Sequence, residues 1–141
     1  MKRIISFLLA VVMTFAFAFS VSADKQEQTT IVPRYAYIAA TLVDINIDES
    51  TNVTLNEAYF DTYDRTLEVQ IELKLQRYNN SKWNTVKTWT ASGIGEAEVY
   101  ERWAVPSGYT YRDYVTFKVY DSNGNLIESV TRSDSQYFPP L

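Results

Sequence analysis

The sequence predicts an all-β protein, and two observations support that prediction. Leu67, Val69, Ile71, Leu73 and Leu75 alternate with polar residues, and this period of two indicates a strand with one buried and one wet face. Such alternation is typical of antiparallel sheets, because the strands of parallel sheets are covered on both faces. In addition, no segment combines helix caps with an apolar stripe of helical period.

Seven segments have the composition and length of strands. In chain order they are residues 35–47, 53–60, 67–76, 83–90, 97–105, 111–119 and 126–131. The turn-rich residues 79–82 predict a hairpin between the third and fourth segments. Asn123-Gly124 predicts a second hairpin, with both residues at positive φ. Seven short antiparallel strands in one domain predict an immunoglobulin-like β-sandwich.

Two of these segments carry more specific expectations. Apolar residues of the first segment occupy one face as far as Leu42 and the other face from Val43 onward. We therefore expect a β-bulge, or a passage from one sheet to the other, near Leu42. Tyr111 follows Pro106-Ser107-Gly108 at the place where a tyrosine corner is expected.

The three tryptophans, Trp83, Trp89 and Trp103, are the candidates for the aromatic centre of the core. A large ring packed between two sheets is a hallmark of such sandwiches.

The amino end has the pattern of a secretory signal peptide. Lys2 and Arg3 precede an apolar run over residues 4–19, and small residues lead up to Ala23. We expect cleavage after Ala23, export of the product, and no membrane span in the mature protein. The predicted organisation is a signal peptide (1–23), a flexible leader (24–34) and one β-sandwich domain (35–141).

Composition excludes several classes of function. The first 23 residues hold two of the 13 lysines and arginines and none of the 17 acidic residues, so the mature chain has 11 cations, 17 acids and a net charge of −6. An acidic surface repels phosphate backbones, so we expect no nucleic-acid partner. The chain has no histidine and no cysteine, which removes the usual catalytic bases, thiol nucleophiles and zinc ligands. We expect no cofactor.

Residues 44–48 have the Asp-x-Asn-x-Asp spacing that opens a calcium loop. Such a loop also needs glycine at its sixth position and an acid at its twelfth. Those positions are Glu49 and Leu55. We therefore expect a polar strand face, with Ile45 and Ile47 turned inward, and no metal site.

Glu96 and Glu98 form the carboxylate pair best spaced for acid/base chemistry. Residues of one parity on a strand lie about 6.5 to 7 Å apart, which is within the range that glycosidases use. An enzyme also needs one of the two buried in a pocket with a raised pKa, whereas a solvated strand face leaves both exposed.

Tyrosine is the dominant aromatic residue, with 11 copies. Tyr114 and Tyr120 have the parity opposite to Val115 and Phe117, so we expect them to face outward. If the neighbouring strand contains Tyr100, the three tyrosines share one exposed face, which could stack on sugars or anchor a protein. Ordinary cross-strand pairing of surface tyrosines is the alternative.

Three stretches resemble a known family. Residues 83–89 (Trp-Asn-Thr-Val-Lys-Thr-Trp), 105–112 and 119–125 resemble an uncharacterised family of short, secreted, single-domain proteins of Gram-positive bacteria. The resemblance implies an immunoglobulin- or fibronectin-III-like fold and supplies no catalytic residues. Asp113 and Glu57 depart from the pattern and leave the register of their strands open.

These features favour a secreted, non-catalytic domain that binds a cell-wall glycan or an extracellular protein. The binding surface would be the face with Tyr100, Tyr114 and Tyr120, or the loops at one end of the sandwich. One alternative is a small glycan hydrolase that uses Glu96 and Glu98. Another is an envelope protein that self-associates through its edge strands.

Overall fold

Seven antiparallel strands form the computed structural model, which describes residues 35–140. The predicted signal peptide (1–23) and leader (24–34) lie outside the described residues. The strands are β1 (Ile38–Asp48), β2 (Val53–Thr62), β3 (Glu68–Asn79), β4 (Lys82–Ile94), β5 (Glu96–Ala104), β6 (Tyr109–Tyr120) and β7 (Leu126–Phe138). All seven predicted strands are present, and β7 is seven residues longer at its carboxyl end than the segment 126–131.

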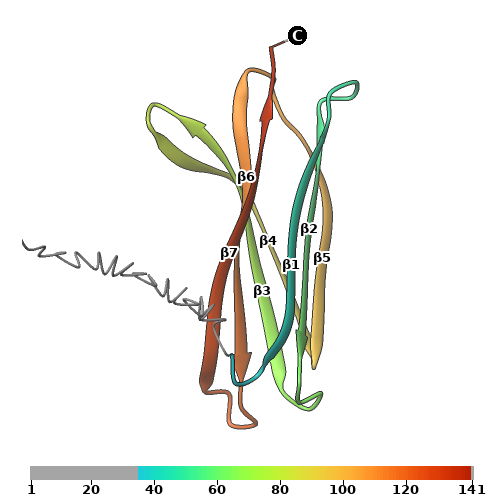
Figure 1. Ribbon diagram of the computed structural model, residues 1–141, viewed down its shortest axis with the longest axis vertical. Coiled ribbons are helices and arrows are strands. Elements are labelled where there is room, and N and C mark those ends of the chain that lie inside the picture. Colours follow the sequence, from blue (N-terminus) through green and yellow to red (C-terminus); the bar gives the residue numbers. More distant parts are fainter. Residues whose placement is uncertain (1–34, 141) are drawn as a thin grey trace, which may run out of the picture. The chain divides into compact units, whose positions relative to one another are not determined.

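The strands form two sheets that pack face to face, as predicted for a β-sandwich (Figure 1). A three-stranded sheet has the order β1-β2-β5, and a four-stranded sheet has the order β4-β3-β6-β7. Every neighbouring pair is antiparallel. None of residues 35–140 belongs to a helix long and apolar enough to cross a membrane.

Both predicted hairpins are present, but their turns differ. Asn80 and Ser81 both have positive φ, 52° and 60°, which matches the right-handed twist of the flanking strands. In the second hairpin only Gly124 has positive φ, so the expectation for Asn123 was wrong. The Asp121 carboxylate explains the difference, because its Oδ1 accepts the amides of Asn123 (2.8 Å) and Asn125 (2.9 Å) and holds a longer turn.

The change of parity in β1 comes from a bulge, although not at Leu42. The register between β1 and β2 shifts between Ile38 and Ala40. After the bulge, Ile45 and Ile47 point into the core, each 5% exposed, while Leu42 is 46% exposed. In β2 the register is also settled, because Glu57 lies on the outer face between buried neighbours.

The core is centred on phenylalanine and aliphatic residues instead of tryptophan. Phe60 and Phe117 pack with ring centroids 5.2 Å apart, and both are fully buried. Of the three tryptophans only Trp89 packs against the core, where it is partly buried, so the expectation was wrong for Trp83 and Trp103. They lie on β4 and β5, which are edge strands, whereas the centre of the sandwich is filled by the strands that have neighbours on both sides.

The predicted tyrosine corner is confirmed. Tyr111 is fully buried on β6, and its hydroxyl donates a hydrogen bond to the carbonyl oxygen of Pro106 at 2.7 Å. Burial raises the pKa of this hydroxyl, which keeps it a donor. The bond ties the chain entering β6 to the strand itself.

The edge of β1 is closed by side chains of β7 instead of by another strand. The Glu128 carboxylate accepts the backbone amides of residues 36, 37 and 38, each at 2.9 Å. Further along, Asp134 Oδ2 accepts the amide of Ile45 (3.2 Å) and Gln136 Oε1 accepts that of Ile47 (2.9 Å). Polar residues on the inward parity of β7 thus satisfy amides that an open edge would expose.

We predict that Glu128→Ala destabilises the protein by about 1 to 3 kcal/mol, because three backbone amides lose a charged acceptor. Urea denaturation measures the change in the free energy of unfolding. Glu68→Ala is the matched control, since Glu68 is exposed at the start of β3, and we expect it to change stability by less than about 0.5 kcal/mol. Equal effects of the two substitutions would contradict the role of Glu128 at the edge.

Candidate functional site

The structure separates the three predicted tyrosines. Tyr114 and Tyr120 lie on the outer face of the four-stranded sheet, as their parity indicated. Tyr100 is 54% exposed on β5, which pairs with β2 in the other sheet. The expectation of one shared face was therefore wrong, because the two outer faces of a sandwich point in opposite directions.

Tyr114 and Tyr120 are also far apart from each other. They are six residues apart on one strand, which corresponds to about 20 Å. Tyr120 lies at the end near Glu68, and its hydroxyl is 3.4 Å from Gln70 Oε1. Tyr114 pairs with Lys74, toward the opposite end of the sheet.

Tyr114 instead belongs to a cluster at the end of the four-stranded sheet from which the turn of the β3–β4 hairpin projects (Figure 1). Strand register places three cross-strand pairs on consecutive outward positions there. We call this cluster the hairpin surface; it consists of Lys74, Gln76, Tyr78, Trp83, Arg112 and Tyr114. Its members come from β3, β4 and β6, which is why no single segment of sequence revealed it.

Arg112 is the centre of the hairpin surface. Its guanidinium carbon lies 4.2 Å from the centroid of the Trp83 ring and 4.9 Å from that of Tyr114. Its Nε donates a hydrogen bond to Gln76 Oε1 at 2.8 Å, and Gln76 Nε2 donates in turn to Thr85 Oγ1 at 3.2 Å. Within residues 35–140 the two terminal nitrogens of Arg112 have no hydrogen-bond partner. The guanidinium is thus fixed in place with its outer donors open to a ligand.

Aromatic rings extend this surface across the sheet. The Tyr78 and Trp83 rings are tilted by 57° with centroids 5.1 Å apart, and Tyr78 is 45% exposed. The same row continues through the small Thr110 to Tyr137 on β7, which is 56% exposed. Three amphipathic rings therefore lie in one row across the sheet.

Charge sets the hairpin apart from the rest of the domain. Residues 73–95 contain no acidic residue and four cations, Lys74, Arg77, Lys82 and Lys87. By contrast, the outward positions of the three-stranded sheet include six carboxylates, Asp44, Asp48, Glu57, Asp61, Glu96 and Glu98. The run without acids was the signal in the sequence that could have located the hairpin surface.

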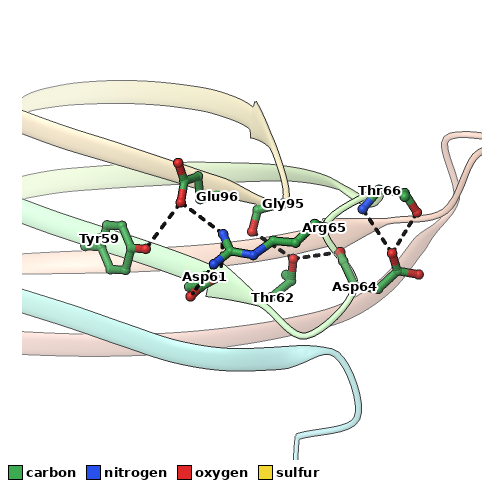
Figure 2. Close-up of polar contacts among 8 residues, drawn as sticks. All are labelled: Tyr59, Asp61, Thr62, Asp64, Arg65, Thr66, Gly95 and Glu96. Carbon is green, nitrogen blue, oxygen red and sulfur yellow. Dashed lines mark hydrogen bonds and ion pairs between the residues drawn. The ribbon is translucent and has the colours of Figure 1, made fainter.

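The predicted carboxylate pair is exposed. Glu96 and Glu98 both lie on the outer face of β5. The Glu96 carboxylate is 2.9 Å from Arg65 Nη1, which also lies 2.9 Å from Asp61 (Figure 2). A hollow of about 560 Å³ lies further along the same face, but its walls include Leu55 and neither glutamate. Neither residue therefore has the enclosed environment that a general acid requires.

The contacts around Glu96 hold two neighbouring loops together. Thr62 donates to the Gly95 carbonyl oxygen from both its amide (3.0 Å) and its hydroxyl (2.8 Å) (Figure 2). Gly95 has φ +76°, and a Cβ there would lie 2.9 Å from the backbone of Arg65. The ion pairs of Arg65 thus fasten the β2–β3 loop to the turn between β4 and β5.

Asp113 is the carboxyl group with the largest shift. It is fully buried on β6, and neither carboxyl oxygen has a hydrogen-bond partner. Burial raises its pKa to about 8, and the charges of Asp134 and Asp44 add to the effect. Asp113 is thus enclosed between the two sheets, out of reach of a substrate.

The calcium-like spacing over residues 44–48 belongs to a strand, as expected. Ile45 and Ile47 are buried, and Asp44, Asn46 and Asp48 point outward from extended backbone. Among residues 35–140 no group of acidic side chains is arranged to hold a metal ion.

In the comparison with known proteins, neither a protein-family model nor a curated protein matches this chain.

We predict that Asp113→Asn removes a pH dependence of stability. The native pKa of Asp113, about 8, lies above the ordinary value of 3.8, so the native state keeps a proton that the unfolded chain releases. Between pH 4 and pH 8 the wild type should therefore lose stability relative to Asp113→Asn by up to about 1.4 kcal/mol per pH unit. Below about pH 4 the two proteins should differ by a constant amount.

Urea denaturation of both proteins at a series of pH values measures this difference. Asp64→Asn is the control, because Asp64 is exposed on the β2–β3 loop and the hydroxyl of Thr66 lowers its pKa. Its stability should therefore run parallel to that of the wild type between pH 4 and pH 8. Parallel curves for the wild type and Asp113→Asn would show that Asp113 is ionised in the folded protein.

Proposed function

We propose that this chain is a secreted, non-catalytic binding domain that acts at the cell surface or outside the cell through its hairpin surface. The observation that carries the proposal is the geometry of Arg112. Stacking on Trp83 and Tyr114 and the bond to Gln76 already fix its side chain. A partner that engages its terminal nitrogens therefore loses little of the ordering entropy that usually weakens binding.

The composition of the surface supports the same conclusion. Tryptophan, tyrosine and arginine are the residues most often found to dominate binding energies. Here one of each is in direct contact, at the end of a sheet where Tyr78 is also exposed. The amino-terminal pattern over residues 1–23 supports export, which would place the partner among cell-wall glycans and extracellular proteins.

The environments of the carboxylates favour binding over hydrolysis. Glu96 is neutralised by Arg65, and the strongly shifted carboxyl of Asp113 is enclosed. These environments fit a domain that binds its ligand without a reaction.

We expect Trp83→Ala and Arg112→Ala each to weaken binding of a ligand by about tenfold or more, as for other central aromatic and arginine contacts. The purified protein would be passed over immobilised cell-wall polysaccharides and extracellular proteins, and binding to each positive ligand measured by titration. Tyr100→Ala is the matched control, because Tyr100 is an exposed aromatic residue on the opposite face. Full binding by the Trp83→Ala and Arg112→Ala variants, or loss of binding in Tyr100→Ala alone, would overturn the proposal.

A further inference from the structure

We infer that the ligand of the hairpin surface is an acidic polysaccharide, a glycan chain that carries carboxylate groups. The inference rests on the proposed function and adds the chemistry of the partner. Three properties of the surface lead to it: its charge, the fork of Arg112, and the row of rings and hydroxyl groups around them.

Charge complementarity selects an anionic ligand. The hairpin surface carries the cations Lys74 and Arg112 and no acid, while the outward positions of the three-stranded sheet carry six carboxylates, two of which pair with Arg65. A negatively charged chain is attracted to the hairpin and repelled by the opposite face. The same field disfavours a cationic partner on the hairpin surface.

The two terminal nitrogens of Arg112 favour a carboxylate as the charged group of the ligand. A guanidinium whose Nε is already bonded, here to Gln76 at 2.8 Å, presents its two terminal nitrogens side by side. This edge matches the two oxygens of a carboxylate in a bidentate pair. Lys74, the other cation of the hairpin surface, is already paired with Glu72 at 2.7 Å.

A single free guanidinium also limits the charge density of the ligand. A nucleic acid carries a phosphate on every nucleotide and binds through many cations at once. Arg77 and Lys87, two of the nearby cations, lie over the rings of Tyr109 and Trp103, which are not part of the hairpin surface. A ligand with sparse charges along a neutral chain therefore fits better than a nucleic acid.

The surroundings of Arg112 match sugar rings. Tyr78, Trp83 and Tyr137 lie along one row, and the apolar face of a sugar can pack on the parts of their rings that stay exposed. Hydroxyl groups both donate and accept, as sugar hydroxyls do. Short hydroxyl side chains occupy the outward positions of the two flanking strands: Thr85, Thr88, Thr90 and Ser92 on β4, and Ser129, Thr131, Ser133 and Ser135 on β7.

The test compares ligands that differ in the carboxylate alone. The purified full chain would be titrated with hyaluronan and with partly methyl-esterified polygalacturonate, whose carboxylates are separated by neutral sugars, and with fully methyl-esterified polygalacturonate, which keeps the same backbone without the charge. Single-stranded poly(U) serves as an anion of a different class. We expect at least one polyuronate to bind about tenfold or more tightly than the fully esterified polymer, and its affinity to fall as salt increases.

Variants of arginine identify the group that binds the carboxylate. Arg112→Ala should lower the affinity for the polyuronate about tenfold or more and change the affinity for the fully esterified form little. Arg112→Lys should restore only part of the lost affinity, because lysine keeps the positive charge but lacks the two parallel N–H donors of a guanidinium. Arg102→Ala, on the opposite face, should bind as the wild type does. Thermal unfolding of each variant verifies that it is folded.

Three results would overturn the inference: equal affinity for carboxylate-bearing and fully esterified polymers, tighter binding of poly(U), or no binding of any polyuronate at millimolar concentration. If a neutral glycan or a protein then bound through Trp83, the inference would fall while the proposed function stood. If binding survived loss of both Trp83 and Arg112, the proposed function would fall with it.

Discussion

The hydrogen bond from Tyr111 to the Pro106 carbonyl oxygen is the interaction on which the rest of the structure depends. It joins the loop before β6 to the strand and fixes where the alternation of β6 begins. With Tyr111 turned inward, Arg112 and Tyr114 must face solvent and Asp113 must face the core, because strand side chains alternate. The buried carboxyl and the exposed guanidinium are thus two consequences of one register. A shift by one residue would exchange them.

The same register explains why so many polar residues point inward on β7. Its inward positions include Glu128, Asp134 and Gln136, which pair with inward residues of β6 and accept backbone amides at the edge of β1. These bonds link the two sheets and satisfy five backbone amides at or just before the edge of β1. On the edge strand β4, a register shift near Val86 and the inward Lys87 interrupt the regular pairing pattern, a feature with which natural sheets limit edge pairing.

Local patterns predicted the local structure and not the order of strands. The alternation around Ile71 was enough to predict β3, and the loop before Tyr111 was enough to predict the tyrosine corner. Both depend on the periodicity or the turn residues of a short segment. The position of Trp103 could not be predicted, since parity tells which face a residue has but not whether its strand lies at an edge. Tyr100 was misplaced for the same reason. In β2 the polar residue Asn56 occupies an inward position where the pattern has apolar residues. Its side-chain amide is satisfied there, because it donates hydrogen bonds to a threonine two residues before it and to a carbonyl oxygen of β5.

The two outer faces of the sandwich differ in chemistry: one is acidic, and the other has aromatic rings around the Arg112 guanidinium. The register of β6 places that guanidinium on the outer face. The most direct test of that register is a ¹³C NMR titration of the Asp113 carboxyl carbon. With Asp113 inside the sandwich, its signal should change with a midpoint near pH 8. A midpoint near 3.8, the ordinary value for an exposed aspartate, would place Asp113 in solvent and Arg112 in the core, and would contradict both the fold of this strand and the surface built on it.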